Sequence, residues 1–452
     1  MPRSIVRYVG LDVHKRIVEA CIVDPAGKVV QRKRFPLRRE TLDLFAAKTL
    51  KPGDHVALEA TTNCWAVADR LRPRVARVLV SNPMATKAIA QAKVKTDKVD
   101  AHVLAQLLRC NFLPEVWQPD EATRQLRELT RRAAALTSER TKMKNRIHSV
   151  LATRLIETPE SLFTERGLHW LTGVELDLQA RMLIDADLRQ LERLQGEMDS
   201  LEEELLRRAY DLDAARLLMT LPGVGAATAL AILAAWGDPT RFPDADHAAA
   251  YLGLVPSTKQ SADHCYHGPI TKQGNCHARW MLIQAAHHLE RHPGPLGHFF
   301  HRLKRRKNHN VAVTACARKL AVIAWRMVTI GEPYRYAIPR STEAKLAKLR
   351  VKVTGERRKS GSPKGTKPKA KLPGGSRTIR SLPQVCRSEG LPSPRPLSPG
   401  ERRTIRQTGS EPLVKQIAAT QVVPRRTVAK AATKSTDHPA KGSSTRKRKI
   451  PS

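Results

Sequence analysis

The sequence contains few cysteines and no long apolar run. Its seven cysteines are scattered and never spaced as Cys-x-x-Cys, so neither a disulfide framework nor a zinc ribbon is predicted. No apolar stretch reaches the roughly 20 residues that cross a bilayer, and the first residues lack the charged-then-apolar layout of a signal peptide. We therefore expect a cytoplasmic protein with no membrane partner. Five potential metal ligands lie close together, but their spacings fit no standard zinc site: His264, Cys265, His267, Cys276 and His277.

Acidic residues are also scarce. The 452 residues include 80 Lys and Arg but only 42 Asp and Glu, which gives a formal net charge of +38. Residues 342–452 hold 28 of these basic residues against 6 acidic ones, and the preceding part of the chain is basic as well. Because neutralising phosphates releases bound counterions, this balance favours a nucleic-acid partner. An anionic membrane surface is a weaker alternative, since no basic amphipathic helix stands out.

The length allows two or three domains, and the first ~110 residues are predicted to form an α/β layer structure. Short β-rich runs alternate there with helical segments and are separated by turn residues such as Pro25-Ala26-Gly27. Strands are predicted at 5–11, 17–23, 28–35, 55–60 and 75–80, and helices at 39–47, 64–71 and 83–92.

Four acidic residues of this region are candidate metal ligands. Asp12 directly follows the first predicted strand, and Glu59 lies at the end of the fourth. Asp97 and Asp100 project from one face of the first turn of a helix, which is predicted from apolar residues at helical spacing. Taken singly, each acid has a plainer explanation as an exposed strand end or a partner of the helix dipole. Together they favour a hard divalent cation near a substrate phosphate, because carboxylates that share a small volume repel unless a cation neutralises them.

Three sequence blocks place these acids in a more specific context. The blocks are Leu11-Asp12-Val13-His14-Lys15, Leu58-Glu59-Ala60-Thr61 and Lys95-Thr96-Asp97-Lys98-Val99-Asp100-Ala101. In this order they resemble the motifs of the DEDD transposases of bacterial insertion sequences, relatives of the Piv-type DNA invertases. The resemblance implies an RNase H-like N-terminal domain similar to the Holliday-junction resolvase RuvC, with Asp12, Glu59, Asp97 and Asp100 as a tetrad for Mg²⁺ or Mn²⁺. Thr62-Asn63 departs from the family, which often has a glycine after its glutamate.

Residues 119–213 are predicted to form a helical, coiled-coil segment. Two stretches carry apolar residues at the a and d positions of heptads, which favours a helical hairpin or a dimerising coiled coil. Each stretch has only about three heptads, so packing into an ordinary core explains the pattern nearly as well. The heptad positions are Leu126, Leu129, Ala133, Leu136, Met143, Ile147 and Val150, then Ile184, Leu191, Leu194, Met198, Leu201 and Leu205, with Arg140 as a polar exception. Basic residues of the first stretch suit either a solvated face or a nucleic-acid backbone: Arg131, Arg132, Arg140, Lys142, Lys144 and Arg146.

A mainly helical domain is predicted next, and it opens on a possible phosphate-binding turn. Residues 221–229 have the layout of a helix-hairpin-helix element, in which Gly223 and Gly225 let the backbone approach a phosphate oxygen. A plain glycine turn between packed helices is an equally good explanation.

Further along, a second block extends the resemblance. Gly268-Pro269-Ile270-Thr271-Lys272-Gln273-Gly274-Asn275 is similar to the C-terminal signature of the same transposases, in which a loop serine precedes such a block. The resemblance implies a nucleophilic serine, and counting back from Gly268 places it at Ser261. Ser257 is the reserve candidate, because Ala262-Asp263 stands where the family usually has glycine after its serine. A loop serine on its own is usually a turn residue. Lys272 and Arg279 add positive charge around this loop.

Past residue 341 the sequence predicts a disordered basic tail. It has no aromatic residue after Tyr336 and is rich in Pro, Ser, Thr, Lys and Arg, so it lacks the apolar surface that offsets chain entropy. The resemblance stops before it, at about residue 335. The expected domains are 1–118, 119–213, 214–340 and 341–452.

The sequence thus predicts a transposase or site-specific recombinase that cuts and rejoins DNA through a transient phosphoserine link at Ser261. The resemblance also implies that a structured guide RNA can supply sequence choice, in a bacterial cytoplasm at the nucleoid. The helices at 122–210 suit a homo-oligomer, a dimer or tetramer. Two alternatives stay open: a Holliday-junction-type endonuclease whose tetrad activates water, and a non-catalytic nucleic-acid-binding protein whose acids are surface residues.

Overall fold

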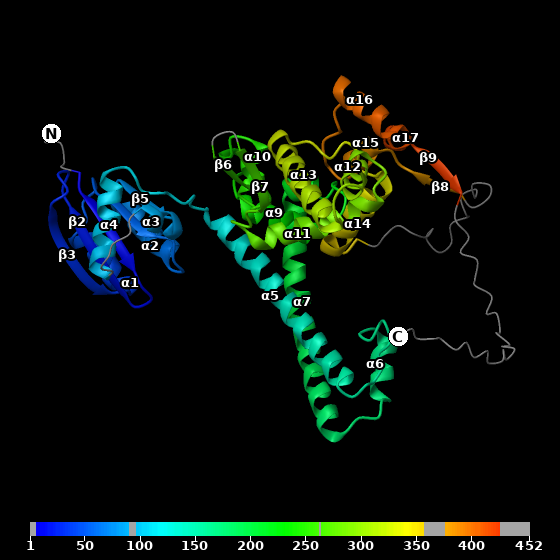
Figure 1. Ribbon diagram of the computed structural model, residues 1–452, viewed down its shortest axis with the longest axis horizontal. Helices are drawn as coiled ribbons and strands as arrows, with labels where there is room; N and C mark the ends of the chain where they lie inside the picture. The colour runs from blue at the N-terminus through cyan, green and yellow to red at the C-terminus, as the bar shows by residue number, and fades with distance from the viewer. Residues whose placement is uncertain (1–5, 90–95, 262–263, 357–375, 425–452) are drawn as a thin grey trace, which may run out of the picture. The chain divides into compact units, whose positions relative to one another are not determined.

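The structure is a computed structural model that describes residues 6–89, 96–261, 264–356 and 376–424. The chain divides into two compact units, Met1–Ala122 and Thr123–Ser452. Figure 1 shows a sheet flanked by helices in the first unit and mostly helices in the second. The predicted fold class, an α/β N-terminal region followed by a mainly helical remainder, is therefore confirmed. Within the described ranges, no helix is both long and apolar enough to cross a membrane.

The first unit is built on a five-stranded mixed sheet in the order β3-β2-β1-β4-β5. β1 pairs antiparallel with β2, and β2 with β3, whereas β1, β4 and β5 run parallel. β1 extends beyond the predicted strand end at residue 11, because Asp12 still pairs with Glu19 across the ladder. The strands are β1 Tyr8–Val13, β2 Ile17–Val23, β3 Val29–Pro36, β4 His55–Glu59 and β5 Arg77–Ser81.

The two faces of this sheet carry different helices. Because side chains alternate along a strand, Val9 and Leu11 belong to the core shared with α1 and α2, whereas Gly10 faces α4. A methyl group at position 10 would lie only 2.0 Å from the carbonyl oxygen of Ala101, so the absence of a side chain lets α4 lie directly on β1. The helices are α1 Arg39–Lys48, α2 Cys64–Leu71, the 3-10 turn η1 Arg72–Arg74, α3 Pro83–Ile89 and α4 Asp97–Arg109.

A long helical hairpin opens the second unit. α5 and α7 run antiparallel, since Arg132 of α5 pairs with Glu197 of α7 and Arg146 pairs with Asp187 (Figure 1). At the far end, α6 closes a separate buried cluster of Ile147, Leu151, Leu162, Leu171 and Ile184. The bounds are α5 Glu121–Ala152, α6 Glu165–Thr172 and α7 Leu178–Asp211. Dimerisation through these helices stays a prediction.

The rest of the second unit is a helical core around the fully buried side chains of Trp236 and Phe300. The indole N–H of Trp236 donates to the carbonyl of Ala248 at 3.1 Å, which satisfies the donor on burial. An antiparallel hairpin of β6 and β7 stands at the surface. The elements are α8 Asp213–Leu218, α9 Ala226–Trp236, η2 Pro239–Arg241, α10 Ala245–Ala250, β6 Pro256–Ser261, β7 His264–Ile270, α11 Cys276–His287, η3 His288–Arg291, α12 Pro295–Lys304 and α13 His309–Ile330.

The prediction of a disordered tail is wrong for the described part of residues 341–452. Leu382, Cys386 and Leu391 are buried in the same core as Trp236. The prediction from composition is wrong here because this segment buries its few apolar residues against a surface that other parts of the chain provide. The elements are α14 Pro339–Thr354, β8 Ser376–Ile379, α15 Leu382–Ser388, α16 Pro399–Thr408, α17 Glu411–Ala418 and β9 Gln421–Pro424. The rest of the predicted tail lies outside the described residues.

Candidate active site

Two predicted acids lie side by side at the end of the parallel strands β1 and β4. The register pairs Gly10 with Ala57 and Leu11 with Leu58, so Asp12 and Glu59 are the next residues on the two strands. By alternation both follow Gly10 and Ala57 onto the face that α4 covers. The sheet therefore brings together two carboxylates that are 47 positions apart in the sequence.

The other two acids are placed by the start of α4. Thr96 caps this helix, and its hydroxyl accepts a hydrogen bond from the N–H of Val99 at 3.4 Å. The cap sets Asp97 and Asp100 in the first turn, as the spacing predicted. Since α4 lies against β1 at Gly10, its first turn comes to the strand end that carries Asp12.

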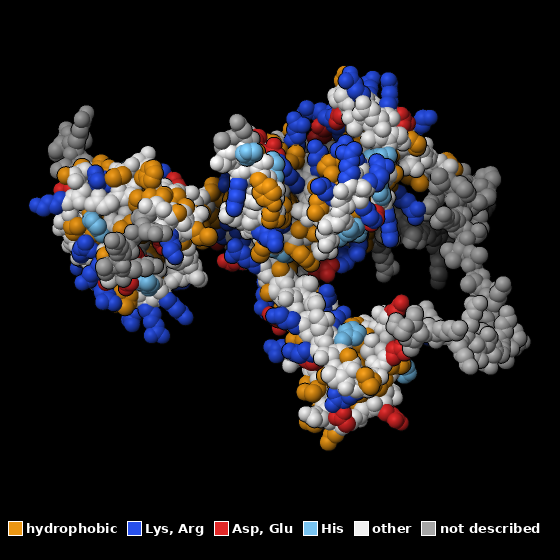
Figure 2. Space-filling model, in the orientation of Figure 1, with side chains coloured by type: hydrophobic (Ala, Val, Ile, Leu, Met, Phe, Trp, Pro, Cys, Tyr) orange, Lys and Arg blue, Asp and Glu red, His pale blue; other side chains and the backbone are white. Residues whose placement is uncertain are grey.

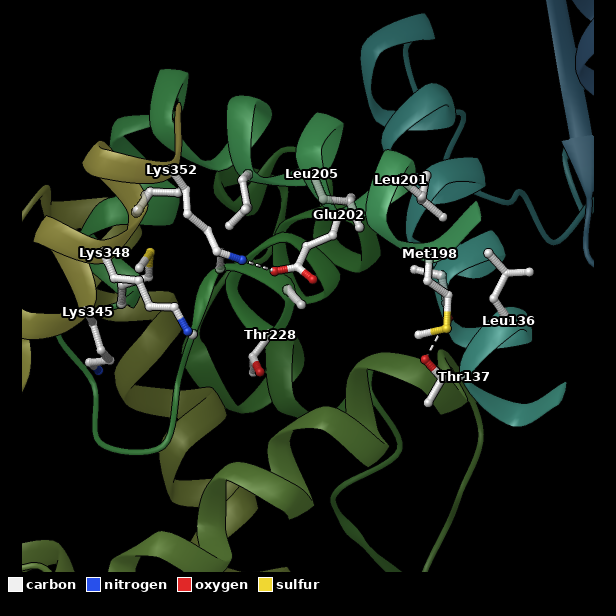
Figure 3. A pocket seen from close by; sticks show the side chains of 17 residues that line it. Leu136, Thr137, Met198, Leu201, Glu202, Leu205, Thr228, Lys345, Lys348 and Lys352 are labelled. Carbon is white, nitrogen blue, oxygen red and sulfur yellow. Dashed lines mark hydrogen bonds and ion pairs between the residues drawn. The ribbon is translucent and has the colours of Figure 1, made fainter. Parts of the chain in front are cut away.

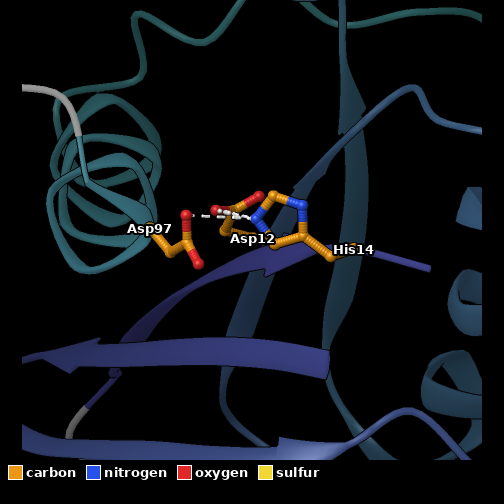
Figure 4. A group of neighbouring side chains, drawn as sticks. All are labelled: Asp12, His14 and Asp97. Carbon is orange, nitrogen blue, oxygen red and sulfur yellow. Dashed lines mark ion pairs between the residues drawn. The ribbon is translucent and has the colours of Figure 1, made fainter. Parts of the chain in front are cut away.

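A histidine that the sequence argument did not select lies between these elements. The Nε2 atom of His14 is 3.1 Å from Oδ2 of Asp12 and 3.3 Å from Oδ1 of Asp97 (Figure 4). Among the described residues, these three side chains are the group whose ligand atoms all lie within 4.8 Å of one another. The sequence places His14 two positions after Asp12, but its distance to Asp97 depends on how α4 packs on the sheet.

The electrostatics of this group suit a cation. Burial raises the pKa of Asp12, His14 lowers it, and the negative charges of Asp97 and Asp100 raise it further. The side chain of Asp12 is 16% exposed and that of Asp97 is 48% exposed, so the site opens to solvent on the α4 side. Hard carboxylate oxygens with an open side fit a divalent ion that also binds a substrate phosphate. Glu59 and Asp100 lie outside the group of three but at the same end of the sheet.

Ser261 is the last residue of β6 and is exposed at the surface. It pairs in register with His264 of β7. Ala262 and Asp263, which replace the expected glycine, lie outside the described residues. The reserve candidate, Ser257, is half-buried near the base of the hairpin. Its hydroxyl lies close against Gly268, because a methyl group added to that glycine would be only 2.5 Å from it. Of the two serines, Ser261 is the more accessible to a large substrate.

The six basic residues predicted to contact nucleic acid along α5 have different surroundings. Arg132 and Arg146 pair with acids of α7 and so hold the hairpin together. The ammonium of Lys144 lies 4.6 Å from the centre of the Phe163 ring, and burial lowers its pKa. Arg131 and Lys142 are exposed and Arg140 is half-buried, which leaves these three better placed for a phosphate backbone.

The predicted glycine turn has the expected layout, with α8 before it and α9 after it. Gly223 has a φ of +73°, and a methyl group there would lie 2.4 Å from the carbonyl oxygen of Ala285, so its role is packing against α11. Gly225 precedes α9, carries no side-chain cap and has open space around it. The start of α9 at Gly225, Ala226 and Ala227 lines a cavity, whereas Gly223 is needed for the turn itself.

The signature loop is held by backbone contacts. Lys272 is exposed and has a φ of +57°, while the guanidinium of Arg279 donates to the carbonyl of Leu252 at 2.9 Å. The structure thus gives Arg279 a partner within the fold and leaves Lys272 pointing to solvent.

A cavity of about 440 Å³ lies beside the glycine turn (Figure 3). The ammonium of Lys345 donates to the carbonyl oxygens of Leu221 at 2.7 Å and Val224 at 3.0 Å, and so ties α14 to the turn. Burial lowers the pKa of Lys345 to about 7. The lining combines apolar side chains of α5 and α7 with lysines of α14, namely Leu136, Met198, Leu201, Leu205, Lys345, Lys348 and Lys352.

Comparisons with known proteins agree with this arrangement. A family model of DEDD type, described as a transposase, matches residues 9–154, and a second, described as the transposase IS116/IS110/IS902 family, matches residues 215–302. The chain is 26% identical over 337 residues to the transposase for insertion sequence element IS1328 of Yersinia enterocolitica, covering 72% of this chain and 98% of the relative. It is 26% identical to the transposase for IS1111A of Coxiella burnetii, over 73% of this chain and 92% of that protein. The pilin gene-inverting protein of Moraxella bovis is also 26% identical, over 72% of this chain and 97% of its own length.

Proposed function

Because this chain belongs to the IS110 family of DEDD transposases, we propose that it cuts and rejoins the DNA of an insertion sequence. The observation that carries the proposal is the group formed by Asp12, His14 and Asp97, with the charge of Asp100 acting on Asp12. Membership of a DEDD family also suggests dependence on a divalent metal.

The predicted tetrad supplies the ligands for this metal. Asp12, Glu59, Asp97 and Asp100 offer only carboxylate oxygens, which suit Mg²⁺ or Mn²⁺. Bound there, such an ion would offset the charge that develops on the oxygens of a scissile phosphate. The Nε2 atom of His14 lies within hydrogen-bond distance of both Asp12 and Asp97, so this side chain would help to hold the two carboxylates toward one another.

Ser261 is the nucleophile in this proposal. Its hydroxyl loses a proton, its oxygen forms a bond to phosphorus, and the bond from phosphorus to one DNA oxygen breaks. The released strand end takes up a proton. The phosphoserine link keeps the bond energy, so attack by another strand end can reseal DNA without an external energy source. The exposure of Ser261 at the end of β6 supports this role.

A structured guide RNA and a homo-oligomer complete the proposal. In this scheme base pairing between the RNA and DNA selects the sites, and the protein recognises the nucleic-acid backbone and the shape of the nucleic acid. The exposed basic residues of α5 support a nucleic-acid contact.

A denaturing gel tests the chemistry. Purified protein with its co-purified RNA is incubated with labelled element-end DNA and Mg²⁺, and covalent protein–DNA adducts are measured. We expect an adduct that Ser261→Ala and Asp97→Ala both abolish, while Ser257→Ala retains it. Cleavage without an adduct, unchanged in Ser261→Ala, would instead show a nuclease that activates water.

A further inference from the structure

The described part of the C-terminal region, residues 376–424, is docked on the helical core of the second unit; we call it the C-terminal extension. Leu382 and Cys386 of α15 and Leu391 are buried in that core, and Ile405 of α16 is 4% exposed. Leu413 of α17 packs against Gly294, at the start of α12. Both family models end at or before residue 302, so the extension lies beyond the matched residues.

Two acids of the extension point toward the core rather than to solvent. Glu401 pairs with Arg335 at 2.5 Å, and the carboxylate of Glu389 lies 3.5 Å from Arg350. In addition, Arg216 donates to the carbonyl of Glu389 at 3.0 Å. The two ion pairs place two of the three acids of the extension on its inner side, whereas Glu411 of α17 is exposed.

The outer side of α16 is consequently basic. Glu401, Ile405 and Thr408 form the inner face at a spacing of four and three residues, which turns Arg403 and Arg406 outward. Both arginines are exposed and make no ion pair within the described part of the chain. Arg402 is exposed as well, and its Nε donates to the carbonyl of Leu397. Figure 2 shows Lys and Arg side chains gathered over this helix.

α16 packs against α12, which leads into a second basic run. Arg305 and Arg306 follow the last turn of α12 and are exposed. A helix of this length spans only about 15 Å, and packed helix axes lie about 8–10 Å apart, so the two groups of arginines fall within reach of one duplex. Over that distance a duplex presents many phosphates, with one charge per ~1.7 Å of its axis.

We propose that the outer face of α16 and the exposed arginines that follow α12, Arg305 and Arg306, together bind the phosphate backbone of duplex DNA, independently of the catalytic residues. No large apolar side chain among the described residues is exposed on α12 or α16, which argues against insertion into a membrane surface. The outer face of α16 also carries no aromatic side chain on which single-stranded bases would stack. The inference rests on the proposed function only in taking DNA as the substrate.

The experiment measures binding of the full chain to an unrelated labelled duplex, without divalent metal, at several salt concentrations. The variants are Arg403→Ala/Arg406→Ala, Arg305→Ala/Arg306→Ala and their combination. Each lost phosphate contact lowers the salt slope by ~0.9, so a double variant that loses two contacts should gain about tenfold less affinity than the wild type when salt falls from about 200 to about 50 mM, and the combination less still. The matched control, Arg189→Ala/Arg193→Ala, removes the same charge from exposed positions of α7 and should bind like the wild type.

The outcomes separate this inference from the proposed chemistry. Asp97→Ala should bind the duplex like the wild type even though it forms no adduct. An unchanged affinity and salt slope in the combined variant would overturn the inference, as would an equal loss in the control. A combined variant that keeps its affinity for DNA but loses binding to vesicles of anionic lipid would overturn it in favour of a membrane surface.

Discussion

At the residue scale, the spacing of the candidate active-site acids depends on a missing side chain. The Cβ of an alanine at position 10 would lie 2.0 Å from the carbonyl oxygen of Ala101 and 2.6 Å from the N atom of Ala105, and neither backbone atom can rotate away. α4 would have to shift, and its acids with it. We expect Gly10→Ala to lower the free energy of unfolding by about 1–3 kcal/mol and to weaken metal binding, as measured by chemical denaturation and metal titration.

Gly196 of α7 provides the control, because a methyl group there would meet no atom within 4 Å. Replacing a helical glycine with alanine normally stabilises by roughly 0.5–1 kcal/mol. Equal effects of Gly10→Ala and Gly196→Ala would contradict the close approach of α4 to β1.

The raised pKa of Asp12 gives a second test at this scale. A carboxyl group whose pKa is raised above its ordinary value of 3.8 contributes stability that is present at lower pH and is lost as the pH rises through the folded-state pKa. At pH 7 without divalent metal, Asp12→Asn should therefore be more stable than the wild type. Mg²⁺ at 100 times its Kd should stabilise the wild type by about 2.7 kcal/mol and the variant much less. Thermal unfolding with and without Mg²⁺ measures both effects. A melting temperature of the wild type that does not change when Mg²⁺ is added would count against the site.

The four acids are predictable from the sequence, whereas the role of His14 is not. The spacing of α4 and the strand ends predicted where carboxylates occur, since these depend on local periodicity. The role of His14 depends on the distance across to Asp97, which Gly10 and the packing of α4 determine. No pattern of neighbouring residues in the sequence determines the distance between His14 and Asp97. The same holds for Ser261, whose position at the end of β6 follows from hairpin pairing while its predicted role as nucleophile rests on resemblance alone.

At the element scale, α14 supports the glycine turn through Lys345. Its pKa is lowered to about 7 by burial, so in the folded state it releases a proton well below the unfolded value of 10.5. The unfolded chain then binds more protons between pH 7 and pH 10, and stability should rise with pH in this window by at most about 1.4 kcal/mol per unit. Lys345→Met should remove this dependence, and Lys348→Met, on the exposed side of the same helix, should retain it. Denaturation midpoints at pH 7 and pH 9 compare the three proteins, and identical pH slopes would refute the assignment.

The helix α15 shows why the composition of the sequence gave a wrong prediction for the end of the chain. The hairpin helices were predictable because their apolar residues repeat along each helix, and Leu136, Ile147, Ile184 and Leu205 are indeed buried. α15 has only seven residues, too few for such a repeat. Its burial depends on a surface built by residues more than 100 positions earlier, including Arg216, which donates to the carbonyl of Glu389. A pattern within a short stretch of sequence does not reveal contacts between parts of the chain that lie so far apart.

At the scale of the whole molecule, several large apolar side chains are exposed at the far end of the helical hairpin. Where α5 ends and α7 begins, Leu155 is 95% exposed, Leu178 is 78% exposed and Met182 is 63% exposed. Clustered apolar side chains of this kind mark association sites in soluble proteins. We propose that the predicted homo-oligomer makes its contact at this end of the hairpin.

Charge placed in this patch should separate the subunits, because a carboxylate cannot be buried in an apolar contact without a partner. We expect Met182→Glu/Leu183→Glu to shift the protein toward the monomer mass in light scattering, with little change in helix content since both residues are exposed. Leu212→Glu is the matched control, because Leu212 is 39% exposed but follows the opposite end of α7. It should leave the mass unchanged. A wild type that is already monomeric, or a control that dissociates equally, would show that this end of the hairpin is not the contact.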